Sequence, residues 1–340
     1  MMHSCIERKT TIWSLYFIFS LSNLILNFAS SETNLCRPDQ KDALLEFRAN
    51  FLPTSSFGAT TLIAVLGIEY YGLVLNRPLR FSSSLFRLQH LEYLNLDNSN
   101  IYGILPHSIG NLKYLSGLSL SECNFCENIP SSLGNLSDLT NHDLSFNDFT
   151  GELPSSMDNF IQLSELHLRF NKLRGNFPPM LLNLSNLNWI NLEYNQFEGN
   201  HFSGPLMIKN ISSPSALEHL NLGENNLVGP ISGFISKLIA LLDLSFWNTE
   251  MGMVDFSIFS HLVSISSTLY FPSSIGILVL SSCNISEFPK FLQNQTSLVH
   301  LDISANQIEG QIPKLLWKLQ KLEYVNFSQN LLKGFEGSAD

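Results

Sequence analysis

The chain has few basic residues and few cysteines. Its 340 residues include 19 Lys and Arg against 29 Asp and Glu, which gives a net charge of −10. Nucleic-acid-binding proteins need basic patches, so this balance argues against nucleic acid as a partner. The acidic residues form no block of like charge, and the acidity therefore mainly favours solubility.

Enzyme motifs are also missing. The sequence has no nucleophile elbow, no glycine-rich phosphate loop and no His or Glu cluster at metal-ligand spacing. Cys123 and Cys126 spell C-x-x-C, but no second pair completes a zinc site. We therefore predict no catalytic residue, no metal and no cofactor, and we expect the protein not to be an enzyme.

The N-terminus is typical of a secretory signal. Arg8 and Lys9 precede an apolar stretch at 12–28, which small residues at 29–31 follow. We predict a signal peptide over residues 1–31 and extracellular localisation. The apolar run is long for a signal, so an uncleaved membrane anchor is the alternative. No second long apolar run follows, which predicts no membrane span after signal removal.

Six N-x-S/T sequons are consistent with passage through the secretory pathway. They are Asn135, Asn183, Asn210, Asn284, Asn294 and Asn326. We predict N-glycosylation at these positions.

A sequence motif recurs every 24 residues, and its copies start at Leu91, Leu115, Leu139, Leu163 and Leu187. Each copy follows the pattern L-x-x-L-x-L-x-x-N-x-L-x-G-x-I-P. A fixed period of this length is the signature of a leucine-rich-repeat solenoid, in which each unit buries its apolar face only by stacking on its neighbours. We predict an α/β solenoid over residues 63–334, with ten to eleven repeats and a concave parallel β-sheet. Short helical turns, such as 155–157 and 314–316, return the chain.

The asparagine of the repeat has a structural role. Where the chain leaves the strand, its backbone groups face inward, and a buried amide can both donate to them and accept from them. This predicts an asparagine ladder formed by Asn147, Asn171, Asn195, Asn225, Asn306 and Asn330. Cys123 and Cys283 occupy the same slot of their repeats.

The repeat spacing is irregular at 195–216 and at 247–276. Leu187 and Leu217 are 30 residues apart, and 36 residues separate Ile239 from Ile275. Counting from Ile239 puts Trp247 in the asparagine slot and Thr249 in place of a core leucine. His142 occupies another leucine slot, where we expect a half-buried side chain that is no catalytic base.

The G-x-I-P variant resembles the plant class of extracellular leucine-rich repeats. Residues 36–47, CRPDQKDALLEF, resemble the N-terminal cap of plant receptor-like proteins. The segments 83–88, 254–259 and 301–306 resemble the same family. The resemblance implies a cell-surface receptor without a kinase, associated with defence or developmental signalling, which binds its ligand on the solenoid and signals through partner kinases.

The chain departs from that family at both ends. Relatives continue the cap with a C-C-x-W-x-G-V-x-C segment, whereas residues 50–61 contain neither Cys nor Trp. We therefore expect a degenerate cap over 32–62 and an unpaired Cys36. The tail at 335–340 is expected to leave the last repeat uncapped, as in a truncated paralogue, a splice form or an incomplete gene model.

Outward-facing strand residues are the candidates for ligand binding, because exposed aromatics beside fixed polar groups are typical of recognition surfaces. The candidates are Tyr93, Asn95, Asp97, Glu165, His167, Arg169, Trp189, Asn191, Glu193, His219 and Asn221, with further columns at His300, Asp302, Tyr324 and Asn326. The stretch 165–193 is the densest. The expected partners are a peptide, glycan or protein ligand on the concave face and a receptor-kinase co-receptor.

Two alternatives stay open. A secreted inhibitor that resembles polygalacturonase-inhibiting proteins would share the repeat, although those proteins end in a cysteine-bearing cap that 335–340 lacks. A non-functional truncated paralogue would also fit the altered cap and the uncapped end.

Overall fold

The computed structural model describes Ala43, Glu46 and residues 68–69, 78–80, 83–177, 179–197, 215–227, 238–249 and 274–337. The predicted signal peptide, the sequon Asn210 and nearly all of the predicted cap lie outside these residues. Within the described part of the chain, no helix is long and apolar enough to cross a bilayer.

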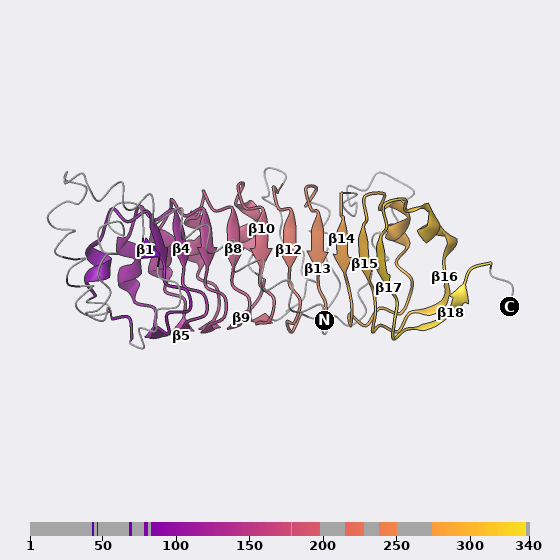
Figure 1. The fold of residues 1–340 in the computed structure, drawn as a ribbon, viewed down its shortest axis with the longest axis horizontal. Coiled ribbons are helices and arrows are strands. Elements are labelled where there is room, and N and C mark those ends of the chain that lie inside the picture. The colour runs from indigo at the N-terminus through magenta and orange to yellow at the C-terminus, as the bar shows by residue number, and fades with distance from the viewer. Residues whose placement is uncertain are drawn as a thin grey trace, which may run out of the picture.

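The repeats stack as one long parallel sheet, which we call the main sheet. Its eleven strands follow one another in chain order, and each pairs with the next in parallel. Figure 1 shows them side by side along the long axis of the molecule. The strands are β1 (Ile68–Glu69), β2 (Tyr93–Asn95), β4 (Gly117–Ser119), β6 (Asn141–Asp143), β8 (Glu165–His167), β10 (Trp189–Asn191), β12 (His219–Asn221), β13 (Asp243–Ser245), β14 (Ile277–Val279), β15 (His300–Asp302) and β17 (Tyr324–Asn326). The predicted solenoid of ten to eleven repeats is confirmed.

Other strands along the flank of the solenoid form two further parallel sheets. The five-stranded one contains β3 (Tyr102–Ile104), β5 (Asn124–Asn128), β7 (Asp148–Gly151), β9 (Lys172–Gly175) and β11 (Gln196–Phe197), and the two-stranded one contains β16 (Glu309–Ile312) and β18 (Leu331–Phe335). The return segments are 3-10 helices: η1 (Ser84–Arg87), η2 (His107–Asn111), η3 (Ser131–Asn135), η4 (Ser155–Asn159), η5 (Pro179–Asn183), η8 (Lys290–Asn294) and η9 (Lys314–Lys318). The turns expected at 155–157 and 314–316 fall within η4 and η9.

Alternation along each short strand separates the core from the open face. In β8 the middle residue Leu166 is fully buried, whereas Glu165 and His167 are half-buried. Successive side chains of a strand point to opposite faces, so the middle residue of the strand points into the core. The buried residues of all the described repeats form a single continuous cluster. We call the other side of the main sheet the open face; it corresponds to the concave face expected from the sequence.

The ladder asparagines hold neighbouring turns together. Asn171 accepts a hydrogen bond from the Phe149 amide at 3.0 Å and donates to the carbonyls of Leu144 at 2.9 Å and Leu168 at 3.1 Å. Corresponding bonds are made by Asn147, Asn195, Asn225, Asn306 and Asn330. Each amide therefore satisfies buried backbone groups of two adjacent repeats.

Smaller side chains occupy the same slot in other repeats. The Cys283 thiol donates to the Phe246 carbonyl at 3.2 Å, and the Cys123 thiol donates to the Leu96 carbonyl at 3.3 Å. Burial raises the pKa of Cys283 to about 12. Neither residue forms a disulfide within the described part of the chain. A thiol thus supplies the donor that the asparagine amide supplies elsewhere.

The long spacings add no strand to the main sheet. β10 pairs directly with β12, and β13 pairs directly with β14. Each irregular stretch is therefore an insertion within one turn of the solenoid rather than an additional repeat.

The register predicted for β13 was wrong. Leu244 pairs with Leu220, so the repeat starts at Leu241, which is buried, rather than at Ile239, which is 61% exposed. Thr249 then occupies the asparagine slot, where it is buried 3.8 Å from the Cys283 sulfur. Trp247 consequently moves to the open face.

His142 is also more deeply buried than expected. It is the middle residue of β6, and its side chain is fully enclosed in the core rather than half-exposed. The neighbouring strands place Leu118 and Leu166 at the same register, and packing between those leucines excludes water from the ring.

Candidate ligand-binding face

The strand register aligns the outward residues in two columns across the open face. The first residues of the strands form one column: Tyr93, Gly117, Asn141, Glu165, Trp189, His219, Asp243, Ile277, His300 and Tyr324. The third residues form the other: Asn95, Ser119, Asp143, His167, Asn191, Asn221, Ser245, Val279, Asp302 and Asn326. Neighbours in a column are one strand step apart, about 4.8 Å.

Many side chains of the second column are used to end their own strand. The side-chain oxygen of Asn191 accepts from the amide two residues on, Glu193, at 3.1 Å. This turn closes a strand locally, and it recurs at Asn95, Asp143, Asn221, Asp302 and Asn326. Asn95 is only 2% exposed, so the prediction that it faces a ligand was wrong: its side chain folds back onto the chain.

The first column contains a connected set of side chains near the middle of the sheet, which we call the central row: Glu165, Trp189, His219 and Asp243. The rings of Trp189 and His219 stack at 4.5 Å, and His219 Nδ1 lies 2.5 Å from Asp243 Oδ2. Next to the row, His167 packs against Trp189 at 5.7 Å and lies 3.3 Å from the Glu165 carboxylate. The structure therefore brings together five outward side chains from four adjacent strands.

A second group lies just beyond the ends of these strands. Asn221 donates to the Glu193 carboxylate at 3.1 Å. Burial raises the pKa of Glu193, while the Arg169 charge and hydrogen bonds from Trp247 and Asn221 act against that rise. Arg169 also lies over the Phe146 ring at 4.9 Å. The Glu193 carboxylate is thus half-buried and held by several partners, which fixes its position.

The remaining candidates lie at a distance from the central row. Tyr93 belongs to β2, three strand steps before β8, and its ring covers Gly117, where an added Cβ would approach within 2.2 Å. Asp97 accepts hydrogen bonds from Ser119 and from the Ser121 amide. At the other end, His300 and Tyr324 stack at 4.2 Å. These residues form separate groups on the same face.

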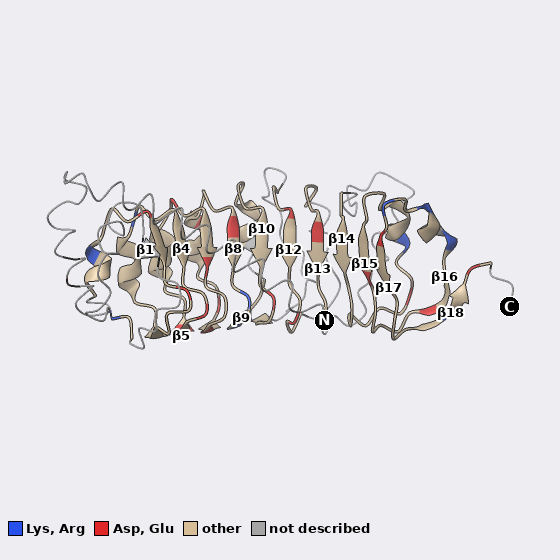
Figure 2. Ribbon diagram, viewed as in Figure 1, with Lys and Arg blue, Asp and Glu red and all other residues tan. Residues whose placement is uncertain are grey.

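Acidic residues dominate the charge of the main sheet. Figure 2 shows them on β8 and β13, whereas Lys and Arg lie outside the main-sheet arrows. As the structure describes them, the eleven strands contain the carboxylates Glu69, Asp143, Glu165, Asp243 and Asp302 and no Lys or Arg. The open face is therefore complementary to a positive ligand.

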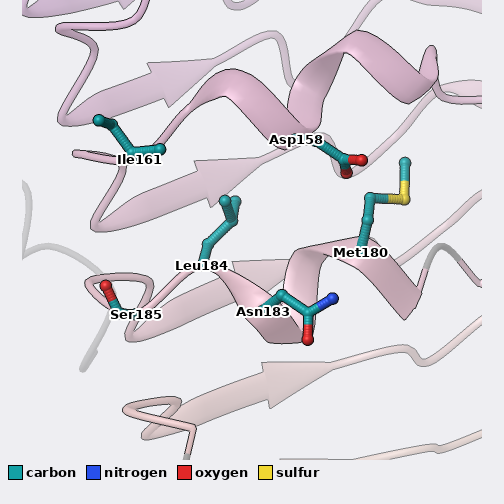
Figure 3. A pocket seen from close by; sticks show the side chains of 6 residues that line it. All are labelled: Asp158, Ile161, Met180, Asn183, Leu184 and Ser185. Atoms are coloured by element: carbon teal, nitrogen blue, oxygen red, sulfur yellow. The ribbon is translucent and has the colours of Figure 1, made fainter. Parts of the chain in front are cut away.

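The return side of the solenoid holds a pocket of about 240 Å³ between η4 and η5 (Figure 3). Asp158 and Met180 lie next to each other at one side of the view, Ile161 and Ser185 lie at the other side, and Leu184 lies between them. One carboxylate among mostly uncharged groups makes no catalytic constellation. The described residues also contain no group of three or more His, Cys, Asp or Glu suited to a metal ion.

Sequence reasoning missed Asp243 and Trp247 at the site because the repeat was counted from Ile239. The spacing Leu241, Leu244, Phe246, with Thr249 in the slot, fits the apolar pattern equally well, and it is the one that the folded protein adopts. It also missed a flank stack in which Phe170 lies 4.5 Å from Phe146 and 4.1 Å from Tyr194. All three aromatic residues of this stack precede a ladder asparagine and have positive φ angles of 53° to 55°.

The described sequons lie in three settings. Asn135, Asn183 and Asn294 are exposed at the last positions of η3, η5 and η8, on the return side. Asn284 is exposed and accepts a hydrogen bond from Gln307. Asn326 lies on the open face, and its amide nitrogen, the atom that would carry a glycan, donates to Asp302 at 3.1 Å.

A stack of parallel strands with an asparagine ladder and 3-10 return segments defines a leucine-rich-repeat solenoid. The protein-family model for the leucine-rich repeat region matches residues 50–331 of this chain. The chain belongs to the leucine-rich-repeat family.

Similar proteins in Arabidopsis thaliana are receptor-like proteins. Receptor-like protein 48 is 46% identical over 98% of this chain and 52% of its own length. Receptor-like protein 47 is 51% identical over the whole chain and 47% of its own length. The chain spans about half the length of these curated relatives.

Solved structures of plant receptor ectodomains have the same fold. The ectodomain of the Arabidopsis thaliana receptor kinase GASSHO1/SCHENGEN3, in complex with CASPARIAN STRIP INTEGRITY FACTOR 2, superposes with a TM-score of 0.66 at 30% identity, over 78% of this chain and 30% of that one. The Arabidopsis receptor kinase HAESA, in complex with the peptide hormone IDA and the co-receptor SERK1, superposes with a TM-score of 0.57 at 26% identity. The match covers 75% of this chain and 44% of that one. These similar ectodomains thus include one that holds a peptide hormone and a co-receptor together.

Proposed function

We propose that this chain is the ligand-recognition region of an extracellular receptor-like protein. It binds a peptide or a protein segment on the open face and signals through a partner kinase in defence or development. Its role is binding, without a catalytic step. The similarity to receptor-like proteins supports this class, and the peptide hormone and co-receptor bound by HAESA support the kind of partner.

The observation that carries the proposal is the exposed indole at the centre of the open face. Trp189 is 41% exposed although it stacks on His219 and contacts His167. An aromatic side chain already held by its neighbours loses little conformational entropy when a ligand covers it, which favours tight contacts there.

The positions of the sequons agree with this use of the face. Glycans on Asn135, Asn183 and Asn294 would extend from the return side and leave the open face uncovered. We propose that these three sites carry glycans and that Asn326 carries none, because its amide is engaged by Asp302.

Selection from a displayed library of random 12-residue peptides on the secreted full chain tests the function. Bound peptides should lose affinity for Trp189→Ala and keep it for Trp317→Ala. Trp317 is a suitable control because it is 67% exposed but lies in η9 on the return side. Selected peptides that bind both variants as they bind the unmodified chain would contradict the proposal.

A further inference from the structure

We propose that the ligand is an extended basic peptide that crosses the strands of the main sheet. Two cationic side chains, four residues apart, pair with Glu165 and Asp243, and the side chain midway between them packs on the Trp189 and His219 rings. This inference rests on the proposed function and names the chemistry of the ligand.

The first argument is charge. The strands of the main sheet carry five carboxylates and no Lys or Arg, as set out above. The basic residue next to the central row, Arg169, lies near Glu193, where burial raises the pKa of the carboxyl group and the Arg169 charge acts against that rise. A surface with this balance attracts a positive segment and repels an acidic one.

The second argument is spacing. Glu165, Trp189, His219 and Asp243 occupy one register column on four adjacent strands. Three strand steps of about 4.8 Å separate the two carboxylate-bearing positions by about 14 Å. In an extended peptide, residues four apart are separated by about 13 Å, and residues i, i+2 and i+4 point to the same side. One face of such a peptide therefore reaches both carboxylates and the rings between them.

The third argument is the remaining capacity of the carboxylates. Glu165 accepts a hydrogen bond from Asn141 at 2.9 Å beside its contact with His167, and Asp243 contacts His219. An ionised carboxylate offers about four acceptor positions. The side chains of Glu165 and Asp243 are 40% and 34% exposed. Each is therefore oriented by its protein partners and still open to an ammonium or guanidinium group.

The surface between the Glu165 and Asp243 carboxylates is formed by aromatic rings. The stacked Trp189 and His219 rings offer an apolar surface on which an aliphatic or aromatic side chain at position i+2 can pack. The surface therefore selects for a pattern, basic–x–apolar–x–basic, rather than for positive charge alone.

Synthetic peptides test the pattern directly, with the secreted full chain as the receptor. Calorimetric titration compares SGKSLSKGS, which has lysines four residues apart around a leucine, with SGKKSLSGS and with SGESLSEGS. The first peptide should bind most tightly, and its affinity should fall with added salt because exposed ion pairs are screened.

Isosteric variants locate the ion pairs. Glu165→Gln and Asp243→Asn keep a hydrogen-bond acceptor for the neighbouring histidines, and each should weaken the first peptide by about three- to fivefold, the size expected for a partly exposed ion pair. Asp148→Asn is the matched control: it removes the same charge from β7, where Asp148 pairs with Lys172 at 2.6 Å, and should leave binding unchanged.

Three results would overturn the inference. These are that the first peptide binds no more tightly than the other two, that Asp148→Asn loses as much affinity as Glu165→Gln and Asp243→Asn, or that these two carboxylate variants bind the first peptide as tightly as the unmodified chain does. The proposed function has a separate outcome. If library peptides depend on Trp189 but lack the basic pattern, the open face is still a peptide site and only the ligand chemistry is wrong.

Discussion

Replacing His142 by leucine should make the folded protein more resistant to acid. The ring of His142 packs edge-on against Phe160 at a centroid distance of 6.0 Å. Burial lowers the pKa of His142 from 6.5 to about 4; a backbone hydrogen bond with Leu118 acts against this shift, and the nearby His167 acts in the same direction as burial. The folded state therefore holds this ring neutral.

The sign of the pH effect follows from proton linkage. Between pH 6.5 and about 4 the unfolded chain binds a proton at His142 that the folded chain does not, so stability falls as the pH decreases through this range. At pH 5 the loss is about 2 kcal/mol, and it approaches about 3 kcal/mol below pH 4, since each pKa unit corresponds to about 1.4 kcal/mol. Above pH 6.5 both states are neutral at this residue and the contribution to the pH dependence vanishes.

The assay compares His142→Leu with the unmodified chain in guanidinium unfolding at pH 7.5, 6 and 5. The advantage of the variant should grow by about 2 kcal/mol from pH 7.5 to 5. Repeat arrays can unfold segment by segment, so hydrogen exchange in β4, β6 and β8 should show the same trend locally. The exposed His107 provides the control, His107→Leu, which removes a histidine at the surface and leaves the core position of β6 unchanged. A constant advantage of His142→Leu across the pH range would refute the reasoning.

Two further predictions concern the asparagine slot. Asn171→Ala should lower the free energy of unfolding by about 1–3 kcal/mol, because it leaves backbone groups of two repeats without partners; a denaturation midpoint equal to that of the unmodified chain would contradict a structural role. In the folded protein at pH 8, iodoacetamide should modify the half-buried Cys126 well before Cys283, because burial raises the pKa of the Cys283 thiol to about 12. Mass spectrometry of the digested protein measures both rates, and equal rates would show that the Cys283 slot opens readily.

The fold could be predicted from the sequence because stacking imposes the same demand on every repeat. Aliphatic residues fill nearly all inward positions, as at Leu166 and Leu220, and this preference repeats visibly along the chain even though β6 has His142 at the equivalent position. The register of β13 could not be predicted in the same way. Ile239 and Leu241 are both aliphatic, and only their burial in the folded protein distinguishes the exposed one from the core residue.

The candidate site was predictable in part. Alternation along the strands identifies Glu165, Trp189 and His219 as outward residues. It does not reveal that the side chains of Asn95 and Asn191 bond to the backbone two residues further on, because these local turns depend on side-chain conformation. Asp243 was missed for the separate reason that it depends on the register of β13.

The inward and outward positions of this solenoid are under different physical demands. In the asparagine slot, thiols at Cys123 and Cys283 replace the amide but still donate to a carbonyl of the preceding repeat, so the chemistry that packing needs is retained. The first column of the open face is less constrained: glycine, asparagine, isoleucine and tryptophan all occur at equivalent register positions. Since the core does not require a half-exposed indole and its stacked imidazole between two carboxylates, we propose that this row contacts the ligand.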